Sequence, residues 1–212
     1  MSDPHLILAS TSPRRKELLD LLGLPFEIIP PAINEKVLGQ ESPTNHVRRL
    51  ALEKAESVAS HYPDSLVIGS DTVIELDGRI LGKPADLEDA HHMLTDLRGR
   101  CHLVHTGLAL ILQNKQMEDT WVETVKVWMK DFSDTDLQAY LKTRDSLGKA
   151  GAYSIQGKGA HLIEKIEGDY PSVVGLPLGK VAELLEKAGY ELSARAEAIY
   201  RKKPYTNWND FE

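Results

Sequence analysis

The alternation of apolar and polar residues along the chain predicts an α/β fold. Short apolar runs bounded by turn residues are typical of buried strands, and apolar residues that recur every three and four positions indicate helices with one buried face. The pattern predicts helices at about 12–22, 42–61, 86–97, 133–143 and 178–188. It predicts strands or extended segments at about 6–9, 26–29, 66–69, 73–76, 79–81, 101–112, 119–130 and 161–166.

Turn residues predict how some of these strands are connected. Asp77-Gly78 separates two short strands and is a strong two-residue hairpin signal, and the polar stretch 113–116 separates two long strand patterns. Strands alternate with helices early in the chain and form hairpins later, which favours a mixed sheet with helices on its faces. The run 66–69 is expected to end before Asp71, which would place this carboxylate at a strand end.

The first predicted helix begins with an unusual cluster of positive charge. Ser12 suits the N-cap and Pro13 the first helical position, but Arg14, Arg15 and Lys16 then occupy the first turn. Because a helix N-terminus already carries about half a positive charge, each cation there costs roughly 0.3–1 kcal/mol. Free backbone N–H groups and clustered guanidinium groups favour a site for a multiply charged anion such as phosphate. A capped helix with solvated basic residues remains the alternative on this segment alone.

Composition and charge narrow the class of protein. The 212 residues suffice for one substantial core or two closely joined lobes, and a net charge of -7 argues against a general nucleic-acid binder. Cys101 is the only cysteine, which excludes an intrachain disulfide and a structural cysteine-zinc site and fits a reducing cytoplasm. Since neither a signal-peptide pattern nor a membrane-length apolar stretch occurs, we expect a soluble cytoplasmic protein that works away from membranes.

The last part of the chain differs in composition from the rest. Residues 193–212 are polar and charged, but they include Trp208 and Phe211. We expect residues 1–192 to form a single domain. The tail is expected to form a helix with a loose end, or a contact to another subunit.

Groups that could bind or act on a nucleoside triphosphate come from separate segments of the chain. They are the cations Arg14, Arg15, Lys54 and Lys83, the acids Glu35 and Asp71, and a glycine-bearing loop around Gln156. Cations can hold phosphates, carboxylates can bind a divalent ion and orient water, and neutral donors can read a base. Each residue also has an ordinary alternative, because Asp71 could cap a turn, Lys54 could be solvated and Glu35 could be a loop acid.

Other chemistries find less support in the sequence. Neither a P-loop pattern nor a Gly-x-Gly-x-x-Gly pattern after the first strand occurs. His102 and His105 are three positions apart on a predicted strand and should face opposite ways, and the adjacent His91 and His92 diverge on a helix. Both pairs are therefore poor metal ligands. The lone cysteine and the lack of a Gly-x-Ser-x-Gly turn leave thiol or serine hydrolysis without local support.

Six short motifs follow one another along the chain. They are ASTSPRRKELL from Ala9, EKA from Glu53, SDTVI from Ser70, GKP from Gly82, KAGAYSIQGKG from Lys149 and VVGLPL from Val173. Together they resemble the Maf family of nucleoside triphosphate pyrophosphatases, over about residues 5–190. The resemblance implies a Maf/ITPase-like α/β fold, with a mixed β-sheet flanked by helices and two lobes around a substrate cleft. It also implies metal-dependent hydrolysis of a nucleoside triphosphate to the monophosphate and pyrophosphate.

The resemblance assigns roles to the candidate residues. Asp71 matches the family's catalytic acid, which accepts a proton from the attacking water or binds metal, and Glu35 matches a second acidic position. Together they would hold a divalent cation, Mg, Mn or Co. Phosphate-binding positions are matched by Arg15, Lys54, Lys83 and, within the same N-terminal loop, Ser12. A homodimer is also implied by the resemblance alone.

Three further positions resemble the branch of the family that acts on dTTP and UTP. They are Arg14, Thr72 and Gln156, where a sister branch acting on 7-methyl-GTP tends to carry Trp, Gln and Glu. The amide of Gln156 both donates and accepts, which suits the carbonyl and N–H edge of uracil or thymine. Two alternatives stay open: a pyrophosphatase for 7-methyl-GTP or another non-standard nucleotide, and an inhibitor of septum formation that acts by binding.

Overall fold

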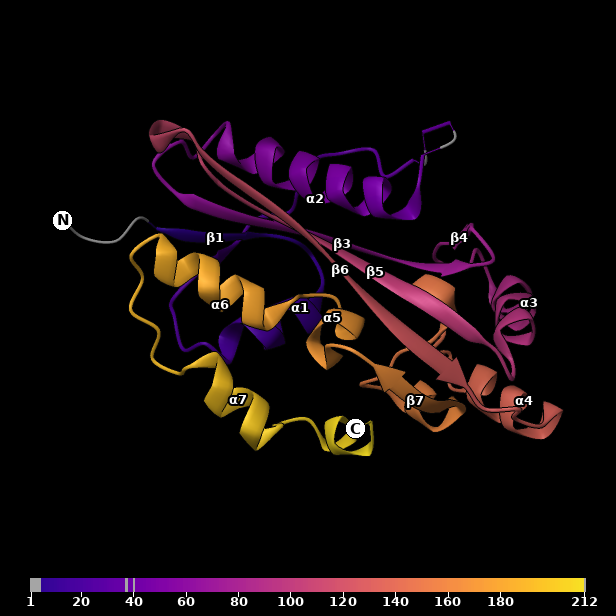
Figure 1. Cartoon of the computed structure of the whole chain (residues 1–212). Helices are drawn as coiled ribbons and strands as arrows, with labels where there is room; N and C mark the ends of the chain where they lie inside the picture. Colours follow the sequence, from indigo (N-terminus) through magenta and orange to yellow (C-terminus); the bar gives the residue numbers. More distant parts are fainter. Residues whose placement is uncertain (1–4, 37, 40, 212) are drawn as a thin grey trace. The chain divides into compact units, whose positions relative to one another are not determined.

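The computed structural model describes residues 5–36, 38–39 and 41–211 of the chain (Figure 1). The strands are β1 (Leu6–Ala9), β2 (Glu27–Ile28), β3 (Leu66–Leu76), β4 (Arg79–Leu81), β5 (Cys101–Leu112), β6 (Met117–Met129) and β7 (Ile163–Glu167). The α-helices are α1 (Pro13–Asp20), α2 (Pro43–Ala59), α3 (Leu87–Leu97), α4 (Asp134–Lys142), α5 (Tyr170–Val174), α6 (Leu178–Lys187) and α7 (Ala196–Lys202). Short 3-10 turns lie at Gln113–Lys115, Ala150–Ala152, Lys158–Leu162 and Thr206–Asp210.

The strands form one mixed sheet in the order β2-β1-β3-β5-β6-β7, with β4 paired to β3. β1 is parallel to both β2 and β3, whereas β4 is antiparallel to β3 and β7 is antiparallel to β6. The β3–β4 pair is the hairpin that Asp77-Gly78 predicts, and β5 and β6 are neighbours as predicted. The predicted mixed α/β sheet is therefore confirmed.

The chain divides into two compact units. Unit 1 contains residues 1–71, 106–123 and 175–202, and unit 2 contains residues 72–105, 124–174 and 203–212. The C-terminal tail is shared between them, since 193–202 belong to unit 1 and 203–212 to unit 2. Among the described residues, no helix is both long and apolar enough to cross a membrane.

Unit 1 is organised around the contact between α2 and the sheet. Ala51, Ala55 and Val58 of α2 are buried against Ile7 of β1 and Val67 of β3. Figure 1 shows α2 lying along these strands, with α6 on the other side of the sheet. Small residues on α2 allow its backbone to approach the strands closely, which brings the polar side chains of α2 within reach of β3.

Unit 2 contains α3, α4 and the glycine-bearing segment. Leu94 and Leu97 of α3 and Leu137 of α4 are fully buried, and α3 contacts both α4 and the 3-10 turn Ala150–Ala152. Ser133 and Asp136 form a capping box at the start of α4, in which each side chain accepts a bond from the backbone N–H of the other residue.

Two expectations from the sequence need correction. β3 continues to Leu76, so Asp71 lies inside a strand and not at its end. The polar residues do not interrupt this strand because their side chains have buried partners: the Ser70 hydroxyl donates to the Gly107 and Gly175 carbonyls, and Asp71 pairs with Lys54. The tail contains the expected helix, α7, but its end is not loose, since Trp208 and Phe211 are buried within this chain.

Candidate active site

The basic turn at the start of α1 has a defined local structure. Ser12 is the N-cap, and its hydroxyl accepts a bond from the Arg15 backbone N–H, as predicted. Lys16 is exposed and pairs with Asp20, whereas Arg14 and Arg15 are half-buried. The Arg15 Nε donates to the Gly175 carbonyl at 2.8 Å, and the Ser70 hydroxyl donates to the same oxygen at 3.0 Å. The Arg15 guanidinium is thereby tied to β3 and to the turn after α5.

Lys54 joins the two predicted acids. Its side chain is buried, and its Nζ lies 2.6 Å from Asp71 Oδ1 and 2.6 Å from Glu35 Oε1. The Asp71 side chain is largely buried as well, while that of Glu35 is 43% exposed. The solvated alternative for Lys54 is therefore wrong. The structure brings Glu35, Lys54 and Asp71 together from a loop, a helix and a strand.

Arg15 shares the electrostatic environment of this group. Burial lowers the pKa of the Arg15 guanidinium below its ordinary value, the Asp71 carboxylate opposes this shift, Arg14 adds to it and Glu35 opposes it. An arginine stays protonated throughout the accessible pH range, so Arg15 keeps its charge, and the electrostatic effects of Asp71, Arg14 and Glu35 show that these groups lie near it. Unit 1 thus holds two carboxylates, an ammonium group and two guanidinium groups in one cluster, which we call the Asp71 cluster (Arg14, Arg15, Glu35, Lys54 and Asp71).

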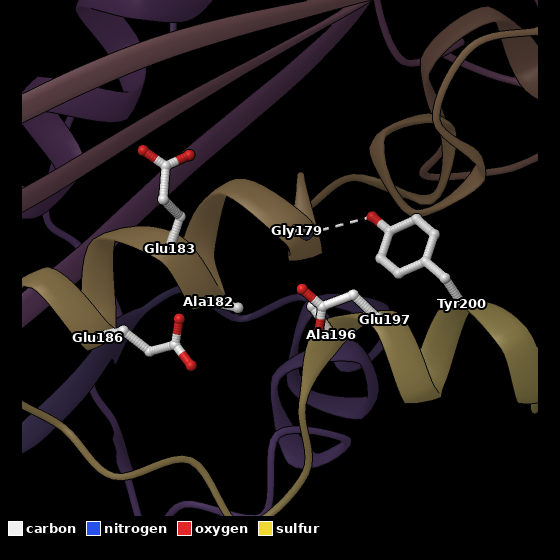
Figure 2. A pocket seen from close by; sticks show the side chains of 7 residues that line it. All are labelled: Gly179, Ala182, Glu183, Glu186, Ala196, Glu197 and Tyr200. Carbon is white, nitrogen blue, oxygen red and sulfur yellow. Dashed lines mark hydrogen bonds between the residues drawn. The ribbon is translucent and has the colours of Figure 1, made fainter.

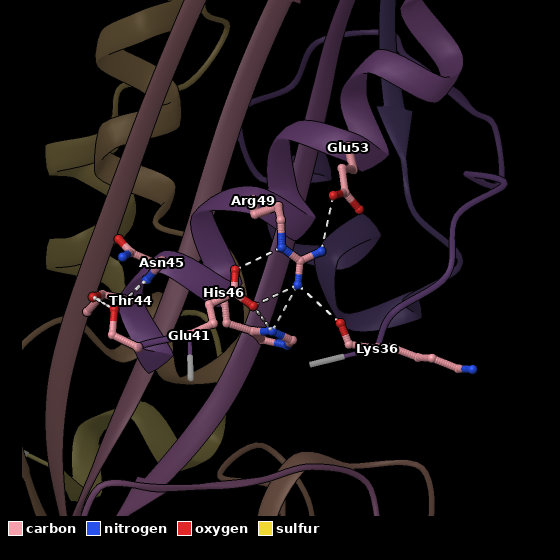
Figure 3. Close-up of polar contacts among 8 residues, drawn as sticks. Lys36, Glu41, Thr44, Asn45, His46, Arg49 and Glu53 are labelled. Atoms are coloured by element: carbon pink, nitrogen blue, oxygen red, sulfur yellow. Dashed lines mark hydrogen bonds and ion pairs between the residues drawn. The ribbon is translucent and has the colours of Figure 1, made fainter. Parts of the chain in front are cut away.

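The loop that carries Glu35 is fastened to α2 by a second ionic group, shown in Figure 3. Arg49 donates to both Glu41 oxygens at 2.8 Å, to Glu53 at 3.1 Å and to the Lys36 carbonyl at 3.1 Å. His46 lies 3.0 Å from the same Glu41. The hydrogen bond from Arg49 is the main reason that the pKa of Glu41 falls to about 2. Arg49 therefore holds the residue next to Glu35 against the helix that carries Lys54.

The donor set in the Asp71 cluster fits a hard divalent cation. Carboxylate oxygens are the ligands that Mg²⁺ and Mn²⁺ prefer. Asp71 and Glu35 each have a carboxylate oxygen 2.6 Å from the Nζ of Lys54, so the two carboxylates lie around one position. No group of three or more His, Cys, Asp or Glu residues arranged to hold a metal occurs within the described ranges. Two carboxylates fit a Mg²⁺ site that is completed by water and substrate phosphates, the usual arrangement where a nucleotide is the substrate.

The remaining predicted residues belong to unit 2. Thr72 follows Asp71 on β3 and is half-buried, and Lys83 is exposed after β4. The Gly82 carbonyl accepts a bond from the Gly151 N–H at 3.0 Å, which joins the GKP and KAGAYSIQGKG motifs. Gly151 has a φ of +61°, and a Cβ there would lie 2.5 Å from Ile74 Cδ1. Glycine is therefore required where these motifs meet.

Gln156 lies in a turn that is held by polar contacts of its backbone. The Gly157 N–H donates to the Ser154 carbonyl, and the carbonyls of Ile155 and Gln156 both accept bonds from Asn207. The side-chain Nε2 of Gln156 is buried and has no hydrogen-bond partner among the described residues. A buried donor without a partner costs free energy, roughly 1–3 kcal/mol, and such a group is expected where a ligand supplies the acceptor.

A surface cavity elsewhere in unit 1 does not suit an anionic ligand. It measures about 590 Å³ and lies between α6 and α7 (Figure 2). Its charged lining residues are Glu183, Glu186 and Glu197, and it contains none of the predicted site residues. The negative charge of these side chains would repel a triphosphate.

The histidines of β5 have structural partners. The His102 ring contacts the Tyr153 hydroxyl at 2.7 Å, and burial lowers the pKa of His102 to about 3. His105 lies between Glu75, at 2.7 Å, and Thr124, at 2.9 Å. The two rings therefore have separate partners.

Sequence reasoning missed the residues that position the charged groups. Ser70 and Gly175 fix Arg15 through one shared carbonyl, and Asn207 fixes the Gln156 turn. Ser70 and Gly175 lie within the SDTVI and VVGLPL motifs, so the sequence marked these positions, but it did not indicate what the two residues do. Asn207 lies in the tail, and nothing in its local sequence distinguishes it from Asn209.

Comparison with known proteins gives consistent results. The family model described as "Maf-like protein" matches residues 5–188. A dTTP/UTP pyrophosphatase of Syntrophus aciditrophicus is 46% identical over 189 residues, which cover 89% of this chain and 92% of the relative. Proteins of the same name from Bacillus velezensis and Clostridioides difficile are 48% and 49% identical, covering 86% of this chain and 96% and 94% of the relatives.

A solved structure resembles the fold at low sequence identity. A HAM1 protein from Coxiella burnetii matches with a TM-score of 0.51 and 15% identity, covering 87% of this chain and 99% of that protein. At this identity the likeness concerns the fold alone, and it agrees with the mixed α/β sheet described above.

Proposed function

The chain belongs to the Maf family, and we propose that it hydrolyses dTTP and UTP to the nucleoside monophosphate and pyrophosphate. The proposal draws on the relatives at 46–49% identity that are named dTTP/UTP pyrophosphatase. The observation that carries it is the Asp71 cluster, because the buried Lys54 holds two carboxylates beside Arg15. A protein that only binds a partner has no need of a buried acid next to a group of cations.

The basic residues in this proposal bind and orient the triphosphate. Arg15 has a fixed Nε, so its guanidinium presents its remaining N–H groups in one direction, and a guanidinium matches phosphate oxygens in a bidentate manner. Lys54 and Lys83 would add charge along the phosphate chain, and Ser12 would contribute from the start of α1. Because phosphoryl transfer depends mostly on positioning and electrostatic stabilisation, these contacts would supply much of the catalysis.

Asp71 is proposed to act on the attacking water. Its carboxylate would accept a proton as the water oxygen forms a bond to the α-phosphorus, and the bond from that phosphorus to the bridging oxygen of the β-phosphate would break. Pyrophosphate would then leave, with no covalent intermediate on the protein. The ion pair with Lys54 fixes the position of the Asp71 carboxylate, whose oxygens are the proposed proton acceptors.

A divalent cation, Mg, Mn or Co, is part of the proposal. Asp71 and Glu35 would hold it together with phosphate oxygens, and when bound it would neutralise charge on the triphosphate. Arg49 supports this arrangement, since it keeps the segment beside Glu35 against α2.

Base selection is assigned to Arg14, Thr72 and Gln156. The Gln156 Nε2 is a buried donor without a partner in the described part of the chain, which suits a carbonyl oxygen of uracil or thymine. Cytosine carries an amino group at the position where uracil carries O4, so this contact would favour UTP over CTP.

A panel of nucleotides tests the proposed reaction. Purified protein should release pyrophosphate from dTTP and UTP faster than from CTP, 7-methyl-GTP or ITP when Mg, Mn or Co is supplied. Preference for 7-methyl-GTP or ITP would replace the pyrimidine assignment with another base class. No release from any nucleotide with any of the three cations would replace the enzyme with a binding protein of the septum-inhibitor kind.

Asp71→Asn tests the role given to this residue. The substitution removes the proton acceptor but keeps the size of the side chain, and Lys54 keeps Glu35 as a partner, so the fold should persist. Turnover of dTTP should fall roughly 10²–10⁴-fold, the usual contribution of a general acid or base. Asp20→Asn removes an exposed carboxylate and serves as the control. Full activity in Asp71→Asn would exclude Asp71 as the proton acceptor.

The setting of the reaction is also a proposal. We infer that the protein works in the cytoplasm as a homodimer, without nucleic acid and away from membranes, and the net charge of -7 supports the part that concerns nucleic acid. Light scattering of the purified protein measures the mass and so tests the dimer. The division into a domain of residues 1–192 and a tail likewise remains a proposal, and the contacts of the tail bear on its role.

A further inference from the structure

Residues 203–211 are part of unit 2, although they lie beyond the region matched by the family model. Trp208 is 3% exposed, and its ring stacks on that of Tyr170 at 5.0 Å with an interplanar angle of 11°. Tyr205 stacks on Trp208, and Phe211 lies over Tyr170. Stacked aromatic pairs of this kind add stability beyond that due to the area that they bury. These contacts hold the end of the tail in a fixed position.

The packing of these aromatic rings places Asn207 next to the turn that carries Gln156. The Asn207 Nδ2 donates to the Ile155 carbonyl at 3.1 Å and to the Gln156 carbonyl at 3.2 Å. One amide thus satisfies two consecutive backbone acceptors in a turn that has no regular secondary structure to satisfy them. The neighbouring side chain of Asn209 is exposed, so the two asparagines of this 3-10 turn differ in role.

The other side of the same segment is held by Asp145. Its carboxylate accepts bonds from Lys149 Nζ at 2.9 Å and from the Lys158 backbone N–H at 3.1 Å. A Cβ at Gly157 would lie 2.4 Å from Asp145 Oδ2, so a larger residue there would displace this carboxylate. The backbone on both sides of Gln156 is fixed, while its buried Nε2 has no partner among the residues that the structure describes. The Gln156 amide is therefore a preorganised donor, because its backbone is held in place before a ligand binds.

We propose that Asn207 is a positioning residue for base recognition, through which the C-terminal tail holds the Gln156 turn in the conformation that reads the pyrimidine. This inference rests on the proposed function for its substrate, but the contact between Asn207 and the turn exists without any nucleotide. Loss of that contact should affect the strength and selectivity of base binding more than the chemical step, because Asn207 bonds to the carbonyls of the turn that carries Gln156, whereas the proposed proton acceptor is Asp71.

Two substitutions of Asn207 and two of Asn209 test the inference in the full-length protein. Asn207→Ala removes the donor, and Asn207→Asp replaces it with an acceptor of the same size that faces two carbonyl oxygens. Asn209→Ala and Asn209→Asp are the matched controls on an exposed neighbour. Amide hydrogen exchange of residues 154–158 is measured without nucleotide, and KM and kcat are measured for UTP, dTTP and CTP.

We expect faster exchange at 154–158 in both Asn207 variants and in neither control. KM for UTP should rise roughly 5- to 30-fold, as for the loss of one or two hydrogen bonds, while kcat changes less than about threefold. The ratio of kcat/KM for UTP over CTP should fall as well, a change that general loosening of the tail would not produce.

Unchanged exchange, or a drop in kcat that is equal for all three nucleotides, would overturn the inference. The two proposals fail in different ways. If the wild-type protein releases no pyrophosphate from UTP or dTTP, the proposed function is wrong, and the exchange data alone then decide whether Asn207 holds the turn.

Discussion

Lys54 lies between Asp71 and Glu35 in the interior of unit 1, and its removal would leave two carboxylates facing each other. We expect Lys54→Met to lower the free energy of unfolding by about 3 kcal/mol at pH 7, as for other buried ion pairs that lose one partner. Chemical denaturation measures this loss. Lys16→Met, which breaks the exposed pair with Asp20, should cost at most about 1 kcal/mol. Equal losses in the two variants would mean that the buried pair contributes no more than a surface one.

At this scale the sequence predicts residue types better than contacts. The charges of Arg15, Glu35, Lys54 and Asp71 suggested phosphate and metal chemistry, and the structure brings all four together. It could not be predicted that Lys54 is buried and joined to both acids, because this depends on how closely α2 approaches β3. Asn207 was missed for the same reason, since its partners are more than fifty positions away.

The ionic group that joins the Glu35 loop to α2 should make stability depend on pH in the acid range. The pKa of Glu41 is about 2 in the folded protein and ordinarily 4.5, so its stabilisation is fully present above pH 4.5 and is lost as the pH falls toward 2. Glu41→Gln should therefore lose less stability than the wild type between pH 5 and pH 2.5. Denaturant unfolding at several pH values measures how the free energy of unfolding changes with pH in the wild type and in Glu41→Gln.

Glu183→Gln is the control for this measurement, because Glu183 forms an exposed pair with Lys180. The free energy of unfolding of Glu183→Gln should change with pH in the same way as that of the wild type. If Glu41→Gln also followed it, the bond from Arg49 would not hold the carboxylate in its ionised form.

The close approach of α2 to the sheet depends on a glycine of β5. A Cβ at Gly107 would lie 2.2 Å from the Val47 carbonyl oxygen, so Gly107→Ala must push the helix away from the strand. We expect a loss of about 3 kcal/mol in unfolding free energy, at the upper end of the usual cost of overpacking. Gly82→Ala meets nothing within 4 Å and should change stability little. Thermal denaturation of the two variants compares them, and similar melting temperatures would contradict the packing argument.

Elements with a strong period or a turn signal were predicted well. The helix predicted at 42–61 is observed as Pro43–Ala59, and the Asp77-Gly78 hairpin occurs where predicted. The extension of β3 through Ser70-Asp71-Thr72 was missed because local polarity predicts a strand end, whereas distant partners allow these residues to be buried. The helix α5 was missed as well, because its five residues are too few to show a period.

At the scale of the whole molecule, six motifs spread along the chain identified the family before any contact was known. The motifs come from both units, and no single one would have sufficed. The order of strands in the sheet was not predictable in this way, because β5 pairs with β3 across the intervening β4 and α3. The tail received no role from the motifs, and its contacts with the Gln156 turn suggest one only when the structure is considered.

The division into two units raises the question whether they unfold separately. β3, β5 and β6 each contain residues of both units, so neither unit is made of a continuous stretch of chain. Because the hydrogen-bonded ladder between β3 and β5 would have to break partway along each strand, we expect a single unfolding transition. Calorimetry should give equal calorimetric and van't Hoff enthalpies, of about 150 kcal/mol near 60 °C from the usual value per residue.

One core truncation in each unit makes this expectation testable. Leu50→Ala lies in unit 1 and Leu137→Ala in unit 2, and both leucines are at most 1% exposed. Each should lower stability by about 2–5 kcal/mol, as buried leucines generally do, and both should shift the same transition. Two separate transitions, with each variant moving only one of them, would show that the units fold independently.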